Sequence, residues 1–368
     1  MKIKYVLCLA LIIYVMILPI SASEYGTDEL KRYIPDDLLE LIPNDVFSDD
    51  IEKSASAVSE ISGLSFVFKY VLQSISDSFP EMLVSFSGVI GIIIFGTAIR
   101  LLIKEEKRAA FDLCSSLCTA AMVFKLQYTL ILDSEKYLSE VSALTGGMIP
   151  VMSAVYAAGG NLASASASAN GMLIFGAVCE LFCSGVMIPL VKICFAVSLA
   201  GTLCRDIGIS EAGKFINKSA IFILTFLAAV SAAVMSCQSV IAQGADSAAT
   251  KIVKFSLGAL VPIVGGAMGD TVKTIFAGLS LVKNTLGVFG VVLIFLFTMP
   301  ILAKLFVSKF LFGVSSALSS LIGAKKEGKF LSDVSGVQNM LIAVCAVSFL
   351  MFTTAFGIFI KSTLGAGV

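Results

Sequence analysis

Histidine and tryptophan are both absent from the 368 residues, and only 14% of the residues are charged. Without histidine the chain lacks the commonest general base, proton switch and zinc ligand, so hydrolase chemistry of the soluble type is not expected. Without tryptophan, any aromatic belt at a membrane surface must be built from tyrosine and phenylalanine. We therefore expect a protein that is not an enzyme and that uses no metal and no cofactor.

Hydrophobic residues, in contrast, make up 57% of the chain, and the mean hydropathy is +0.96. Soluble domains are about 45–50% apolar and about 25% charged, so the apolar excess here must face lipid. Lys plus Arg and Asp plus Glu number 26 each, and this balance gives no reason to expect nucleic acid as a partner. The composition predicts an all-α, polytopic helical membrane protein.

Nine cysteines are present, and none of them falls between residues 24 and 81. Their positions in or beside apolar segments imply no disulfide framework. Cys114 with Cys118, and Cys179 with Cys183, are four residues apart and would share a helix face. We interpret them as small apolar packing residues in preference to thiolate pairs.

The first 23 residues have the form of a signal peptide. Lys2 and Lys4 precede an apolar run, and Ser21-Ala22-Ser23 supplies the small residues that signal peptidase requires. An uncleaved signal anchor is the alternative, and either form sends residue 24 onward across the membrane. Residues 24–81 then form an acidic, extracytoplasmic region, in which apolar spacing predicts one helix over 51–76.

Six segments are long and apolar enough to cross a bilayer, which takes about 20 residues. These spans are 82–103, 109–132, 174–203, 216–238, 286–307 and 338–360. Two further apolar segments, 141–179 and 255–269, are interrupted by proline and glycine, so we expect them to be broken or re-entrant elements. If both cross the membrane instead, the chain has eight spans.

The positive-inside rule favours six spans by a narrow margin. With six, the cytoplasmic loops hold twelve Lys and Arg residues and the outer loops six, whereas eight spans give eleven and seven. The six-span layout also places both broken elements on the outer side, together with the N-terminal region.

An internal duplication is indicated by matching proline motifs. Pro189 and Pro300 are 111 residues apart, and Pro150 and Pro262 are 112 apart. The predicted order after the acidic region is a first transmembrane helix with a basic loop (82–108), repeat 1 (109–220), repeat 2 (221–332) and a final helix with the tail (333–368). In transporters, paired broken segments of this kind mark the place where a substrate or partner meets the membrane interior. Proline and glycine ending helices at similar depths is the simpler alternative.

Three charged residues, Lys125, Glu180 and Lys192, lie within apolar segments. An unpaired charge there costs about 2.5–3.5 kcal/mol, so each should have a partner or line a wet cavity. Glu180 and Lys192 are twelve residues apart, roughly 18 Å along a helix, and cannot pair with each other. A functional relay is possible, but snorkelling lysines and a structural partner for Glu180 are the simpler interpretation.

The richest polar cluster flanks the second broken element. We predict that it forms a gating or partner-docking surface, because irregular backbone inside a membrane is tolerated only where protein or water covers it. Its members are Asp246, Pro262, Gly265, Gly266, Asp270, Lys273, Lys283 and Asn284. No phosphate-binding loop is present, so any energy must come from elsewhere.

Several blocks in the region 224–292 resemble one family. They include Val261-Pro-Ile-Val-Gly-Gly266, Asp270-Thr-Val and Ser280-Leu-Val-Lys-Asn-Thr285. These blocks, with the leader, acidic region and span layout, resemble the stage III sporulation protein AE family. Cys237 and Gln238 stand where smaller or less polar residues would be expected, so packing of that helix is in doubt.

The resemblance implies a multi-pass protein of the mother-cell membrane around the forespore, within a channel or secretion complex that supports late forespore development. Other membrane subunits, a ring-forming protein and an ATPase would be its partners, together with membrane lipid. A self-sufficient secondary transporter for a small solute is the alternative, based on the duplication and on Lys125, Glu180 and Lys192.

Overall fold

A computed structural model of the chain describes residues 34–47, 51–158, 161–203, 209–260 and 265–361. Within 202–214 and 246–279 it describes no side chains. All regular secondary structure in the described part is helical, which confirms the predicted all-α class.

Short helices precede a bundle of very long ones. The short elements are α3 (Asp36–Leu39), the 3-10 helix η1 (Asn44–Phe47) and α4 (Ile51–Ile61). The bundle is built from α5 (Leu64–Leu102), α6 (Glu105–Ala158), α7 (Leu162–Cys179), the π-helix η2 (Glu180–Met187), α8 (Ile188–Leu203), α9 (Ile209–Leu260), α10 (Gly265–Leu321) and α11 (Lys325–Lys361). Because α7, η2 and α8 follow one another without a break, they act as one long helix.

Among the described residues, six helices are long and apolar enough to cross a membrane. Their bounds are Leu64–Leu102, Glu105–Ala158, Ala163–Gly201, Lys218–Ala245, Ser280–Leu321 and Lys325–Ile360. Each contains one of the six spans predicted from the sequence, apart from a few terminal residues of two of them. The six-helix membrane architecture is therefore confirmed.

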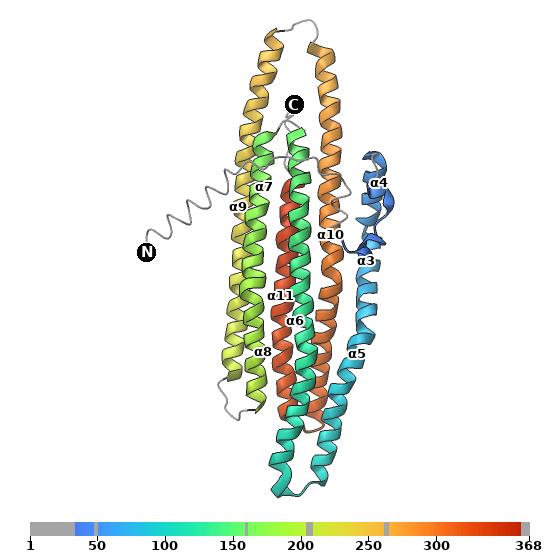
Figure 1. Cartoon of the computed structure of the whole chain (residues 1–368), viewed down its shortest axis with the longest axis vertical. Helices are drawn as coiled ribbons and strands as arrows, with labels where there is room; N and C mark the ends of the chain where they lie inside the picture. The colour runs from blue at the N-terminus through green and yellow to red at the C-terminus, as the bar shows by residue number, and fades with distance from the viewer. Residues whose placement is uncertain (1–33, 48–50, 159–160, 204–208, 261–264, 362–368) are drawn as a thin grey trace, which may run out of the picture.

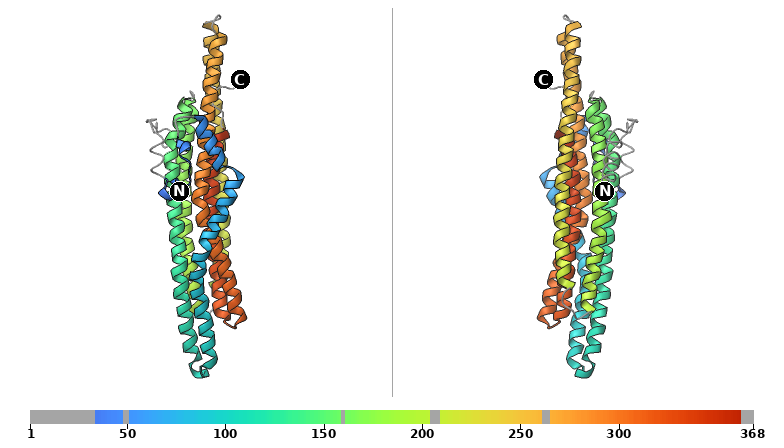
Figure 2. Two further views of the ribbon diagram at one scale, coloured as in Figure 1. Left: turned by 90° about the vertical axis from the view of Figure 1, so that its right-hand side faces the viewer. Right: turned by 90° about the vertical axis from the view of Figure 1, so that its left-hand side faces the viewer.

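The bundle is much longer than a bilayer is thick. Helix α6 has 54 residues, or about 81 Å at 1.5 Å per residue, against a hydrocarbon core of about 30 Å. Figures 1 and 2 show the helices running side by side along one axis, with the ends of α9 and α10 reaching beyond the other helices.

The helix ends fall into two groups. The C-terminal ends of α5, α8 and α10 point towards the lower end of the bundle, and those of α6, α9 and α11 towards the upper end (Figure 1). The three cytoplasmic loops predicted by the six-span layout thus share one end, and both predicted broken segments lie towards the other. This is the order that six spans require.

The first predicted broken segment differs from the expectation. Helix α6 continues through Gly146, Gly147 and Pro150 up to Ala158, and α7 starts at Leu162. The segment is thus the ends of two long helices and not a short re-entrant element. A proline removes one backbone hydrogen bond, a loss that a long helix packed among neighbours tolerates. In the second segment, α9 ends at Leu260 and α10 begins at Gly265, while Pro262 lies outside the described residues.

The N-terminal region also departs from the prediction in one respect. The helix expected over 51–76 is divided in two, because Gly63 takes an extended conformation (φ −64°, ψ 142°) between α4 and α5. Helix α5 then runs without interruption through Pro80 into the first predicted span, so this span has no separate beginning at residue 82.

The core is formed largely by α10 and α11. A Cβ atom at Gly290 would lie 2.3 Å from the ring of Phe356, and one at Gly287 would lie 2.2 Å from Ile360, so these glycines allow the two helices to pack closely. Below them, Phe86 of α5 and Phe312 of α10 meet edge to face with ring centres 4.6 Å apart. Close packing of this kind drives helix association in lipid, where the hydrophobic effect contributes little.

Candidate functional site

An ionic belt crosses the bundle between α5, α6, α8 and α10. The Lys304 ammonium on α10 lies 3.8 Å from Glu81 on α5 and 3.5 Å from Asp133 on α6. Lys192 on α8 lies 2.6 Å from Glu135, two residues further along α6. The belt therefore ties four helices together at one height.

The belt groups are half-exposed, since the Lys304 side chain is 31% exposed and that of Lys192 42%. Exposed ion pairs in water contribute about 0–1 kcal/mol, but an unpaired charge next to lipid costs several times more. The belt therefore matters more as mutual neutralisation of charges in an apolar protein than as a source of stability.

Of the three charged residues predicted to lie in apolar surroundings, the structure provides a partner for Lys192 in Glu135. Lys125 lies on an exposed face of α6, and Glu180 is exposed at the first residue of η2. The three residues come from different helix segments, and no contact among them is found in the described structure. Their predicted roles stay predictions.

The residues of the predicted docking surface lie at or near the junction of α9 and α10. Lys283 is buried on α10 and makes interactions there, and the adjacent Asn284 is exposed. Pro262 lies outside the described residues. For the remaining members the structure gives the helical backbone alone: Asp246 in α9, and Gly265, Gly266, Asp270 and Lys273 in the first turns of α10.

A line of buried polar contacts, not foreseen from the sequence, runs through the bundle interior. Gln338 on α11 donates to Gln127 Oε1 on α6 over 2.8 Å, and both side chains are fully buried. Nearer the lower end, the Ser116 hydroxyl donates to Glu327 Oε1 over 3.2 Å. In an apolar interior such pairs satisfy groups that would otherwise be costly to bury, and so they fix the register of α6 against α11.

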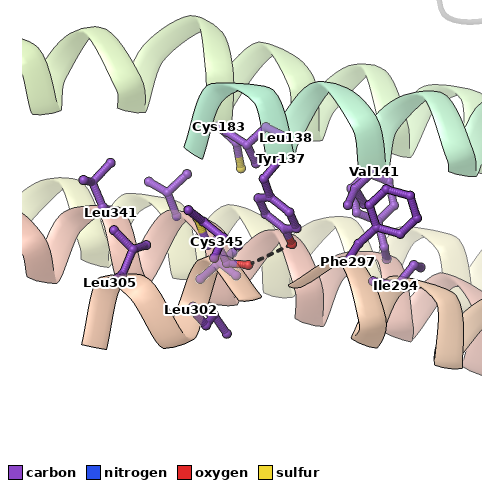
Figure 3. Close-up of a cluster of buried hydrophobic side chains, with 14 of the residues drawn as sticks. Tyr137, Leu138, Val141, Cys183, Ile294, Phe297, Leu302, Leu305, Leu341 and Cys345 are labelled. Atoms are coloured by element: carbon purple, nitrogen blue, oxygen red, sulfur yellow. Dashed lines mark hydrogen bonds between the residues drawn. The ribbon is translucent and has the colours of Figure 1, made fainter. Parts of the chain in front are cut away.

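Tyr137 forms the next contact on this line. Its hydroxyl lies 3.0 Å from Thr298 Oγ1 on α10, and it donates to the Cys345 carbonyl on α11 over 3.4 Å. Figure 3 shows the Tyr137 ring directed into a buried apolar cluster that includes Leu138, Phe297 and Cys345. One phenol thus joins α6, α10 and α11 in the centre of the bundle.

A π-helical segment lies beside this cluster. The sulfur atoms of Cys179 and Cys183 are 3.8 Å apart, and Cys179 also contacts the Ser348 hydroxyl on α11 at 3.8 Å. Both cysteines are buried, as the interpretation of this pair as packing residues expects, whereas Cys114 and Cys118 are exposed. No cluster of three metal-ligating side chains occurs in the part of the chain that the structure describes. The interior therefore offers hydrogen bonds and packing between helices.

Comparison with known proteins identifies the family. The family profile described as stage III sporulation protein AE matches residues 47–363, most of the chain. Stage III sporulation protein AE of Bacillus subtilis (strain 168) is 24% identical over 206 residues, which cover 56% of this chain. The chain matches about half (51%) of that relative's length, and no solved structure matches it. From the extent of the profile match we conclude that the chain belongs to the stage III sporulation protein AE family.

Proposed function

We propose that the protein is a non-enzymatic membrane subunit of the channel or secretion complex that joins mother cell and forespore and supports late forespore development. In this proposal it lies in the mother-cell membrane around the forespore, with its N-terminal region outside the cytoplasm. Family membership supports a sporulation role. The observation that carries the multiprotein part is the length of the exposed apolar surface.

Two charge-free stretches extend from the ionic belt in opposite directions. On α5, residues 82–99 run from Glu81 towards the lower end, and 18 residues correspond to about 27 Å. This stretch exposes large apolar side chains, among them Val84 (73%) and Phe95 (68%).

On α9, residues 219–245 run towards the upper end. Their height follows from Gly171 of α7, where a Cβ atom would lie 3.1 Å from Gln238 Oε1. Lys192 of the belt is 21 residues beyond Gly171, and α9 is antiparallel, so belt height falls near Lys218. The 27 residues that follow span about 40 Å and expose Phe222 (71%) and Phe226 (62%).

Together the two stretches give about 67 Å of exposed apolar helix, about twice the hydrocarbon thickness of one bilayer. A single membrane cannot cover both. Apolar surface of this extent outside lipid marks a protein interface. We therefore infer that other subunits cover the remainder, which favours a component of an assembly over a self-sufficient transporter.

The end of the bundle formed by α9 and α10 is the surface we propose for ring-forming subunits. It extends beyond the neighbouring helices (Figure 1) and carries Asp246, Asp270 and Lys273 close to the junction of the two helices. Charged residues there add electrostatic complementarity to a docking surface, which favours a correct partner over wrong ones.

Affinity purification from membranes of sporulating cells in mild detergent tests the proposal. We expect other membrane subunits and ring-forming subunits to co-elute with the tagged chain. The double variant Asp270→Ala/Lys273→Ala should lose the ring-forming subunits and keep the membrane ones, while the control Lys125→Ala on α6 keeps both. Elution of the wild-type chain alone, folded and monodisperse, contradicts the proposal.

A further inference from the structure

A small polar cavity lies inside the upper half of the bundle, where α6, α7, α9 and α11 meet. It has a volume of about 20 Å³. Its polar lining consists of Tyr156, Ser164, Ser168, Gln238 and Ser239, and its other lining residues are alanine, glycine and apolar side chains. A cavity of about 10–15 Å³ already holds a water molecule that has two to four polar partners. The cavity thus has the size and the chemistry for hydration.

The alternating Ala-Ser sequence at the start of α7 explains this lining. Ser164 and Ser168 are four residues apart and face the cavity on one side of the helix, while Ser166 between them does not line it. Gly171, one turn further on, lets α9 approach, because a Cβ atom there would lie 3.1 Å from Gln238 Oε1. Gln238, which looked out of place in a membrane helix, is therefore held against α7 at the cavity.

The outer surface of α9 at the same depth is apolar. Val234, Val240 and Ile241 are 50%, 70% and 72% exposed, whereas Gln238 and Ser239 turn inwards to the cavity. A helix in contact with lipid alone would gain nothing from this arrangement, since inward polar groups require partners. The lining has hydroxyl and amide groups that donate and accept, and no charged side chain.

We propose that this cavity is a hydrated binding site, within the membrane-crossing part of the bundle, for small uncharged molecules that form hydrogen bonds. It takes up water and neutral polar solutes of similar size, and it excludes ions because no charged group compensates for their dehydration. The site belongs to this chain alone and does not depend on the proposed partners.

Cysteine labelling of the purified full-length chain tests the site. In a background whose native cysteines are replaced, Ser239→Cys and Ser168→Cys place a thiol at the cavity, and Ser236→Cys places one on the exposed face of α9. The probe is iodoacetamide, which is small and neutral, applied to protein in lipid vesicles. Thiolate is the reactive form, and it forms only where the thiol is hydrated, so Ser239→Cys should react at least about tenfold faster than Ser236→Cys.

A variant that fills the cavity provides the second measurement. Ala242→Leu adds volume on the cavity wall and should slow the labelling of Ser239→Cys to the rate of Ser236→Cys. A bulky cationic thiol reagent should leave both cavity thiols unmodified. Equal iodoacetamide rates at Ser239→Cys and Ser236→Cys, or no reaction at either cavity thiol, overturn the proposal whether or not Ala242→Leu folds. Because purified chain is used, this outcome is independent of the co-purification result.

Discussion

Gly290 on α10 faces the fully buried ring of Phe356 on α11, and its substitution by alanine tests the packing of these helices. A Cβ atom there would lie 2.3 Å from the ring, whereas ordinary contact begins at 3.4 Å, so the ring or the helix must shift by 3.4 − 2.3 = 1.1 Å. Overpacking of this kind costs about 1–3 kcal/mol. Gly290→Ala should therefore lower the stability of the protein.

Gly313 on the same helix is the matched control. A Cβ atom there meets nothing within 4 Å, so Gly313→Ala brings no clash. Alanine is about 0.8–1.0 kcal/mol more favourable than glycine in a helix, and this variant should be slightly more stable than wild type. The same chemical change on one helix thus has opposite expected signs.

The assay is the fraction of detergent-solubilised protein that stays monodisperse after heating, read by size-exclusion chromatography of a fluorescent fusion. Phe356→Leu in the Gly290→Ala background should recover part of the loss, because it removes the ring that the new methyl group meets. If Gly290→Ala is as stable as Gly313→Ala, α10 and α11 do not pack as described.

Three further predictions concern the polar contacts. Gln338→Leu should destabilise the protein by about 1–3 kcal/mol, because it leaves the buried amide of Gln127 unpaired, and adding Gln127→Leu should restore much of this loss in a double-mutant cycle by the same heating assay. Lys192→Glu should reduce the yield of folded protein by placing two carboxylates together, and the exchange Lys192→Glu/Glu135→Lys should restore it in membrane fractions; a failed exchange shows that the pair is not formed. Glu180→Gln should leave spore formation unchanged, since Glu180 is exposed and has no role in the proposed assembly, and a loss of heat-resistant spores would instead favour the ion-coupled transporter.

The six crossings could be predicted because about 20 consecutive apolar residues are a strong local signal, and each predicted span lies almost entirely inside a long helix. The ionic belt could not. Glu81, Asp133 and Lys304 were taken as residues at span ends or in loops, and helices longer than their apolar parts give no signal in hydropathy. Charged residues within such helices look like span boundaries in a sequence.

The internal polar contacts divide in the same way. Gln127 and Gln338 lie in or at the start of predicted spans, and a buried amide in such a segment is a signal that a partner amide exists, although it does not say which. Tyr137 lay beyond the predicted span that ends at residue 132, so its junction with Thr298 needed the structure. The family blocks, by contrast, were carried by specific sequence in the region 224–292, and the profile match confirms the family.

Photocrosslinking on both sides of the ionic belt tests the central claim, that other subunits cover part of the apolar surface, most directly. A photoreactive amino acid is placed at Phe95 on α5 or at Phe226 on α9, whose side chains are 68% and 62% exposed. In sporulating cells the account predicts protein adducts at one of the two positions at least, since one bilayer cannot reach both. Lipid adducts alone at both positions would contradict it.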